Sequence, residues 1–123
     1  MVYIFILGKI LFGGYFMRSG YNHIKNLGML TGYAQSKGVP APKLAVFVTG
    51  LMMLFGGLGL IFGPYTQLAT LMLVVFLVPT TIMMHKYWKI VDPMQRMGEN
   101  VNFYKNVALI GALLMLFYLV SSL

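Results

Sequence analysis

The chain of 123 residues contains no cysteine, so a disulfide framework, thiolate catalysis and iron–sulfur ligation are excluded for this chain alone. Acidic residues are almost as scarce, because Asp92 and Glu99 stand against nine Lys and Arg. Charged residues make up only 9% of the sequence and hydrophobic residues 59%, which is far from the balance of a soluble domain. Because the chain lacks cysteine, any redox role is expected to depend on a redox group supplied by another molecule.

Nucleotide-binding and hydrolase motifs are also missing. The glycines between 56 and 63 lie in an apolar run that ends in Gly-Pro, so they predict no phosphate cradle. Ser, His and Asp occur without the context of a catalytic triad, and we expect no catalysis by the chain alone. The formal charge of +7 would suggest nucleic acid in a soluble protein. Here the basic residues flank apolar runs, where anionic lipid favours them, so no nucleic-acid partner is predicted.

Four long apolar runs dominate what is present. About 20 apolar residues in a helix cross the hydrocarbon core, and a helix satisfies its own backbone groups there. We therefore predict an all-α fold: a single domain forming an antiparallel four-helix transmembrane bundle in the lipid bilayer. The first run lacks a basic start and a small-residue cleavage site, so it predicts a retained helix. The expected spans are residues 2–21, 43–62, 66–85 and 103–123.

The three connections differ in polarity. The first is predicted to continue the helix over residues 22–30 and then to form a loop over 31–42, since its glycines and prolines cannot face lipid. The second is an uncharged Gly-Pro-Tyr turn at 63–65. The third is a polar segment over 86–102, which places both carboxylates outside the predicted spans.

Two further features concern the helix interiors. Pro79 is expected to kink the third span, with the hydroxyls of Thr80 and Thr81 available to the freed carbonyls. Small residues recur at spacings that allow close helix approach, which we assign to packing within the bundle, while self-association stays open. The pairs are Gly28 with Gly32, Gly59 with Gly63, and Ala108 with Ala112, besides the adjacent Gly56 and Gly57.

Basic residues gather at the first and third connections, whereas the second turn and the C-terminal end hold none. In an antiparallel bundle these two connections share one face. The positive-inside effect predicts that both are cytoplasmic in a cell membrane, with both termini on the opposite side. The residues are Arg18, Lys25, Lys37 and Lys43 for the first connection, and Lys86, Lys89, Arg96 and Lys105 for the third.

Polar groups converge on that same face, where His23 ends the first span and His85 ends the third. We predict an interfacial pocket for an amphiphile with a polar or anionic head, such as a quinone, with no intrinsic cofactor and no metal. Lipid anchoring by the same residue types is the alternative, and a bis-imidazole haem or metal site is another. The candidate ligand-binding residues are Lys9, Arg18, Asn22, His23, His85, Trp88, Lys105 and Asn106, with aromatic walls from Tyr21, Tyr87, Trp88 and Phe103.

Lys9 needs a separate explanation, because it lies inside the first apolar run. A cation at that depth costs at least a few kcal/mol unless it snorkels, pairs or faces a polar interior. The predicted spans offer it no carboxylate partner, so a carbonyl, a hydroxyl, lipid phosphate or a ligand is expected to serve.

Three segments share the order and spacing of a known family. The first runs from Gly8 to Gly13 and continues to Gly20, the second from Gly38 to the pair at 56–57, and the third from Phe103 to Gly111 with its Lys-Asn core. Together they resemble the DoxX family of small four-helix membrane proteins over nearly the whole chain. Lys9 stands where the family more usually has Arg, and Met53 stands where members often carry Glu.

The resemblance implies a polytopic protein associated with membrane redox systems, such as the DoxD-like subunit of thiosulfate:quinone oxidoreductase or a partner of soluble detoxifying enzymes. It implies no activity that relies on a carboxylate at Met53. We therefore expect an accessory or anchoring subunit of a quinone-linked redox complex, with other subunits of that complex as partners. Two alternatives stay open: a carrier or binding protein for a lipophilic metabolite or lipid, and a purely structural membrane subunit.

Overall fold

The structure, a computed structural model, describes residues 1–121, so residues 122–123 of the fourth predicted span lie outside the described part. All regular structure in this part is helical, as predicted. The elements are α1 (Val2–Lys25), α2 (Leu27–Ser36), α3 (Pro42–Ile61), the 3-10 turn η1 (Gly63–Tyr65), α4 (Thr66–Met84), the 3-10 turn η2 (Tyr87–Lys89) and α5 (Pro93–Ser121).

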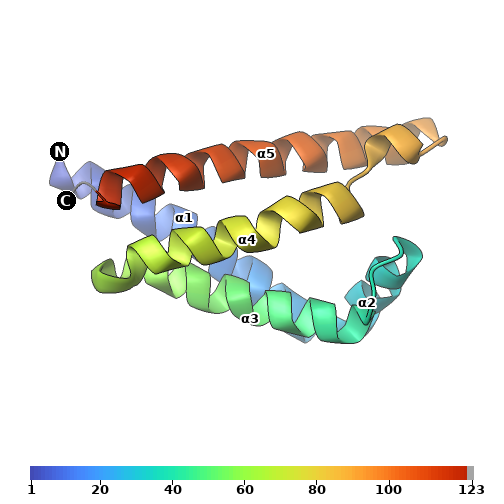
Figure 1. The fold of residues 1–123 in the computed structure, drawn as a ribbon, viewed down its shortest axis with the longest axis horizontal. Helices are drawn as coiled ribbons and strands as arrows, with labels where there is room; N and C mark the ends of the chain where they lie inside the picture. The colour runs from blue at the N-terminus through green and yellow to red at the C-terminus, as the bar shows by residue number, and fades with distance from the viewer. Residues whose placement is uncertain (122–123) are drawn as a thin grey trace.

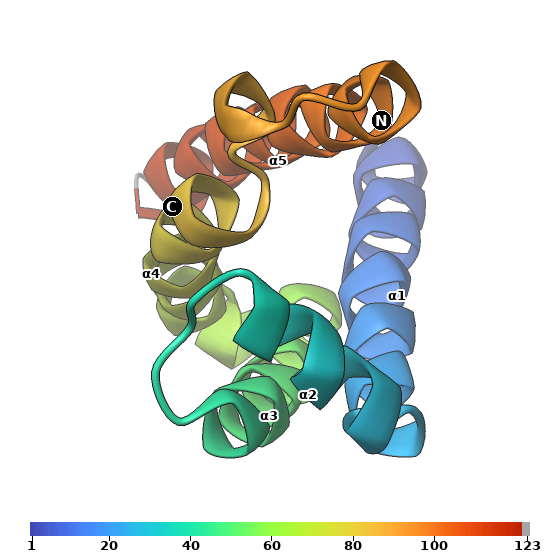
Figure 2. The same ribbon diagram turned by 90° about the vertical axis from the view of Figure 1, so that its right-hand side faces the viewer.

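Four long segments, carried by α1, α3, α4 and α5, have the length and apolar composition needed to cross a membrane. They run antiparallel, with both chain ends at one end of the bundle and α2 and the α4–α5 connection at the other (Figure 1). The predicted helical bundle is thereby confirmed. Packing proceeds from α1 to α3, from α3 to α4 and from α4 to α5. A view along the bundle shows α1 and α5 on different sides of it (Figure 2).

The first connection is more helical than predicted. Residues 31–36, expected in a loop, belong to α2, and the helix breaks at Asn26. Leu30, Tyr33 and Ala34 explain this difference, because their spacing gives α2 an apolar stripe, and Ala34 is buried where α2 packs on α3. Gly38 then turns the chain with a φ of 78°, a conformation that favours glycine.

The third connection also needs correction, since residues 93–102 are the first turns of α5 and not a loop. The start of the helix has a local cause. The Asp92 carboxylate accepts a hydrogen bond from the Gln95 backbone N–H at 3.1 Å, and Pro93 occupies the first helical position. As a consequence Glu99 lies on a helix and turns inward, with only 8% of its surface exposed.

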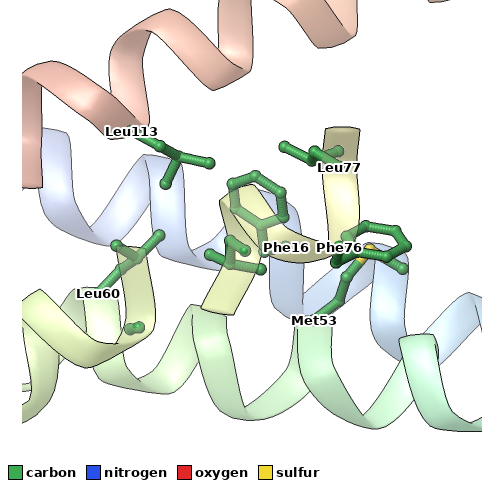
Figure 3. Packing of buried hydrophobic residues seen from close by; sticks show 8 residues of the cluster. Phe16, Met53, Leu60, Phe76, Leu77 and Leu113 are labelled. Carbon is green, nitrogen blue, oxygen red and sulfur yellow. The ribbon is translucent and has the colours of Figure 1, made fainter. Parts of the chain in front are cut away.

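The core is a cluster of apolar side chains from all four long helices, in which Phe16, Met53 and Phe76 meet near Leu60, Leu77 and Leu113 (Figure 3). The close approach of α1 and α3 depends on Gly57, which belongs to the predicted set of small residues, and on Gly13, Gly20 and Gly50, which lie outside that set. A Cβ on Gly57 would lie 2.5 Å from the Gly13 carbonyl oxygen, and one on Gly20 would lie 2.5 Å from that of Gly50. Of the predicted pairs, Gly59 contacts Ala69, whereas Gly28, Gly32 and Gly63 face open space and Ala108 and Ala112 are exposed.

Helix α4 continues through Pro79. The predicted role of Thr81 is wrong, because its hydroxyl is buried and has no hydrogen-bond partner among the described residues. The Thr80 side chain instead lines two cavities at this end of α4.

Candidate functional site

Two cavities adjoin at the end of the bundle that carries α2, and His23, Phe76, Thr80 and His85 line both of them. The smaller cavity has a volume of about 190 Å³ and lies between α1 and α5. We call it the polar chamber, and its other lining residues are Tyr15, Phe16, Ser19, Asn22, Met53, Leu77, Lys105, Asn106 and Leu109.

The larger cavity has a volume of about 460 Å³ and is walled almost entirely by aliphatic, aromatic and methionine side chains. We call it the apolar chamber. Helix α2 and the loop after it close one side of this chamber with Leu30, Tyr33, Ala34 and Val39. The remaining wall comes from α3 and α4, through Ala45, Val46, Thr49, Met52, Val75, Pro79, Met83 and Met84.

Two polar side chains of α5, those of Lys105 and Asn106, line the polar chamber and make no hydrogen bond to each other. Asn106 is only 6% exposed, and no hydrogen bond to its amide group is found within residues 1–121. The Lys105 ammonium lies 5.9 Å from the centre of the Tyr15 ring on α1, and no ion pair with a carboxylate is found for it in the same part of the chain. The Asn106 amide and the Lys105 ammonium therefore offer donors and an acceptor to a ligand in this chamber.

His23 is oriented by α3. Its Nδ1 lies 3.2 Å from the Val46 carbonyl oxygen, and because a carbonyl only accepts, Nδ1 carries the proton. The Thr49 hydroxyl lies 3.4 Å from the same nitrogen and donates its own proton to the Ala45 carbonyl oxygen at 2.6 Å. The nitrogen left for a ligand is therefore Nε2.

His85 is oriented by Glu99, which also contacts side chains from α2, from the residue after α2 and from α5. The His85 Nδ1 lies 3.2 Å from Glu99 Oε1, and the Asn102 amide donates to the same oxygen at 3.0 Å. The Tyr33 hydroxyl donates to Oε2 at 2.6 Å, and the Lys37 ammonium lies 3.0 Å from it. All of these partners donate to Glu99, and a carboxylate that only accepts hydrogen bonds is ionised. The negative charge keeps a proton on His85 Nδ1.

Tyr33 belongs to α2, outside the spans. Burial is the largest cause that raises its pKa above the ordinary value of 10.0, and the hydrogen bond to Glu99 and the negative charge of Glu99 act in the same direction. The hydroxyl therefore stays protonated, and remains a donor, throughout the physiological pH range.

The structure brings five of the eight predicted site residues to the polar chamber: Asn22, His23, His85, Lys105 and Asn106. The other three lie elsewhere. The Lys9 ammonium sits 5.5 Å from the centre of the Phe5 ring, on a turn of α1 that does not reach either chamber. Arg18 is exposed on the same helix, and Trp88 is 46% exposed.

The structure places the four aromatic residues predicted as walls away from the two chambers. Tyr87, Trp88 and Phe103 stack edge to face with one another beside the bundle, and Tyr21 is exposed. None of the four lines either chamber. The aromatic residues of the polar chamber are Tyr15, Phe16 and Phe76, because the third connection is shorter than expected and carries η2 outside.

Glu99 was absent from the predicted site because its segment was expected in a loop. A signal was nevertheless present in the sequence. Once α5 is extended back to Pro93, Glu99 falls on the same helical stripe as Asn102, Asn106 and Leu113, at spacings of three and four residues or their sums. The buried members of α5 are Glu99, Asn106 and Leu113, so this stripe is the inner face.

Comparison with known proteins places the larger part of the chain in one family. The DoxX family matches residues 4–86, a range that includes His23 and His85. The inner membrane protein YphA of Escherichia coli (strain K12) is 29% identical over 85 residues, which cover 68% of this chain and 59% of that protein. The chain thus spans about three fifths of the length of the curated relative that it matches. No solved structure matches it significantly.

Proposed function

The chain belongs to the DoxX family and is an integral, multi-pass membrane protein, and from this premise we propose that it binds a bilayer-borne amphiphile of the quinone type. We further propose that it does so as an accessory or anchoring subunit of a membrane redox complex. The chain has no cysteine, and no group of three or more metal-ligating side chains is found in residues 1–121. In this proposal, electron transfer belongs to the partner subunits.

The observation that carries this proposal is the junction of the two chambers at His23 and His85. A polar chamber suits a head group with oxygen atoms, and an adjoining apolar chamber more than twice its volume suits part of a hydrocarbon tail. A ligand that is only polar would leave the apolar chamber empty. A ligand that is only apolar would leave Asn106 unpaired, which costs about 1–3 kcal/mol for a buried polar group.

The depth of the site fits a head group near the membrane surface. With 29 residues, α5 is about 43 Å long, longer than the roughly 30 Å of the hydrocarbon core. The end of α5 that carries Glu99 lies with α2 and the basic connections (Figure 1). An amphiphile with its head at this level keeps its tail in lipid.

We also propose the sidedness of the protein. Because α2 and the α4–α5 connection lie at the same end of the bundle, the Lys and Arg residues that flank α2 act together with those of the α4–α5 connection in the positive-inside effect. This supports a cytoplasmic location for both connections in a cell membrane, with both termini on the opposite side.

Native mass spectrometry of gently solubilised membranes tests the proposed function, because it reports bound partners and retained ligands together. We expect the wild-type protein to retain a quinone-type mass and to co-purify with larger subunits. Lys105→Gln removes the cation of the polar chamber and should lower ligand retention at least severalfold. Lys89→Gln is the matched control, because Lys89 is exposed and lines neither chamber.

The other outcomes favour other functions. A retained amphiphile without a partner subunit would favour a carrier or binding protein, for which the apolar chamber beside Pro79 would be the transit site. Neither ligand nor partner would overturn the proposal and favour a purely structural membrane subunit. Equal retention by the Lys105 and Lys89 variants would show that the polar chamber does not hold the ligand.

A further inference from the structure

The two histidines that line the polar chamber have the same ring nitrogen, Nδ1, committed to a partner within the protein. The Nδ1 proton of His23 is committed to the Val46 carbonyl, and that of His85 is committed to the Glu99 carboxylate. In each neutral ring the remaining Nε2 is a hydrogen-bond acceptor. Both residues line the chamber, so it holds two acceptors that a ligand O–H group would satisfy.

Two other residues that line the polar chamber supply donors. Lys105 carries an ammonium group and Asn106 an amide, and both come from α5, whereas His23 comes from α1. A carbonyl-bearing head group could use these donors but would leave both imidazole acceptors unsatisfied. A dihydroxy head group can donate to the imidazoles and accept from Lys105 and Asn106 with the same oxygen atoms.

We propose that this site favours the hydroquinone over the quinone, that is, the reduced head group that carries two O–H donors. The preference rests on the proposed function, since it concerns the same chambers. Glu99 is a positioning residue in this account: it does not line either chamber, and it fixes the acceptor atom of His85 by holding the Nδ1 proton. Tyr33, Lys37 and Asn102 keep Glu99 in place.

The test compares three decyl-tailed ligands of the same ring: the hydroquinone, the quinone and the redox-inert dimethyl ether of the hydroquinone. Binding to the full chain in lipid nanodiscs is measured by equilibrium dialysis without oxygen, with a reductant present for the hydroquinone. Because the chain lacks cysteine, the reductant leaves its covalent structure unchanged. We expect the wild-type protein to bind the hydroquinone about tenfold more tightly than either other ligand, which corresponds to one or two net hydrogen bonds.

Two variants separate positioning from folding. Glu99→Gln can hold His85 with either Nδ1 or Nε2 protonated, so the preference for hydroquinone should fall to about twofold or less while the affinity for the dimethyl ether stays the same. His85→Phe keeps an aromatic ring and removes the acceptor, so it should lower the same ratio. Asp92→Asn is the control, because it changes the other carboxylate, can still cap α5, and should keep the ratio near tenfold.

Each remaining outcome is decisive. Equal wild-type affinities for all three ligands would overturn the preference for hydroquinone and leave the proposed binding function standing. Binding of none of them would overturn both. A ratio that falls in His85→Phe and stays unchanged in Glu99→Gln would overturn the role of Glu99 alone.

Discussion

At the scale of single residues, Glu99 has the most consequences. It is one of two acidic residues in the chain, and Tyr33 of α2, Lys37 after α2 and His85 after α4 all contact it. These charge-assisted contacts join α2 to α5, whereas the main packing of α2 is against α3. The same carboxylate therefore supports both the wall of the apolar chamber and the orientation of His85.

Replacing Tyr33 by Phe should loosen this arrangement, because the Glu99 carboxylate loses its shortest hydrogen bond. We expect a loss of about 1 kcal/mol in the free energy of unfolding, at the low end for a charged acceptor since Tyr33 is 38% exposed. Thermal denaturation in detergent measures the change. Tyr65→Phe is the control, because Tyr65 is 66% exposed in a turn and should behave like the wild-type protein.

The pH dependence of that difference has a definite sign. Tyr33 has a raised pKa in the folded protein, so its contribution is fully present below the ordinary value of 10.0 and is lost as the pH rises through the raised value. The advantage of the wild-type protein over Tyr33→Phe should therefore stay constant up to about pH 10 and shrink above it. An advantage that shrinks between pH 6 and pH 9 would contradict the assignment to the Tyr33 hydroxyl.

Residue patterns in the sequence predicted His23, His85, Lys105 and Asn106 as parts of one site, because helix order alone brings them to the same face. They could not exclude Trp88 or Arg18, since the same patterns describe a side chain at the level of the head groups whether it points into the bundle or out to lipid. The direction of a side chain depends on the rotation of its helix, which is set by packing partners that are far away in the sequence.

At the scale of elements, the helices that cross the membrane follow from their long apolar runs, and α3 and α4 begin and end within one residue of their predicted bounds. The errors concern α2 and the first turns of α5. Both segments are polar enough to suggest a loop, yet α2 gains burial from the apolar stripe that contains Ala34, and α5 gains a cap from Asp92. Tertiary packing and capping decided these elements, not hydropathy.

The α1–α3 pair provides an element-scale prediction. Gly57→Ala would place a Cβ 2.5 Å from the Gly13 carbonyl oxygen and 2.9 Å from the Met17 backbone nitrogen, and neither backbone can move without separating the helices. We expect a loss of about 1–3 kcal/mol in the free energy of unfolding, as for other overpacked interiors. The melting temperature in detergent, followed by size-exclusion chromatography, measures this loss.

Gly14→Ala is the matched control for this prediction. Gly14 lies on the same α1 helix, but nothing lies within 4 Å of an added Cβ. The control should be neutral or slightly stabilising, because Ala is the better helix former. If both variants melt at the temperature of the wild-type protein, the close approach of α1 and α3 is not held by glycine.

At the scale of the whole molecule, the bundle has a closely packed apolar core on one side and a chamber that a ligand can enter on the other. Phe16, Leu60, Leu73 and Leu113 fill the centre, while the polar chamber lies between α1 and α5, the two helices at the ends of the packing order. A bundle closed on all sides would have no room for a bilayer-borne head group. The sequence does not predict that α1 and α5 leave a chamber between them. The four apolar runs indicate which segments cross the membrane, but not which helices pack against each other.

The most direct test of the central claim is photo-crosslinking of the protein in nanodiscs with a decyl-tailed azidoquinone, followed by peptide mapping. Binding in the joined chambers predicts label on residues 15–23 and 105–109, lost when unlabelled quinone competes. The contradictory result is label spread over lipid-facing positions such as Leu44, Phe55 and Leu68, with no effect of the competitor.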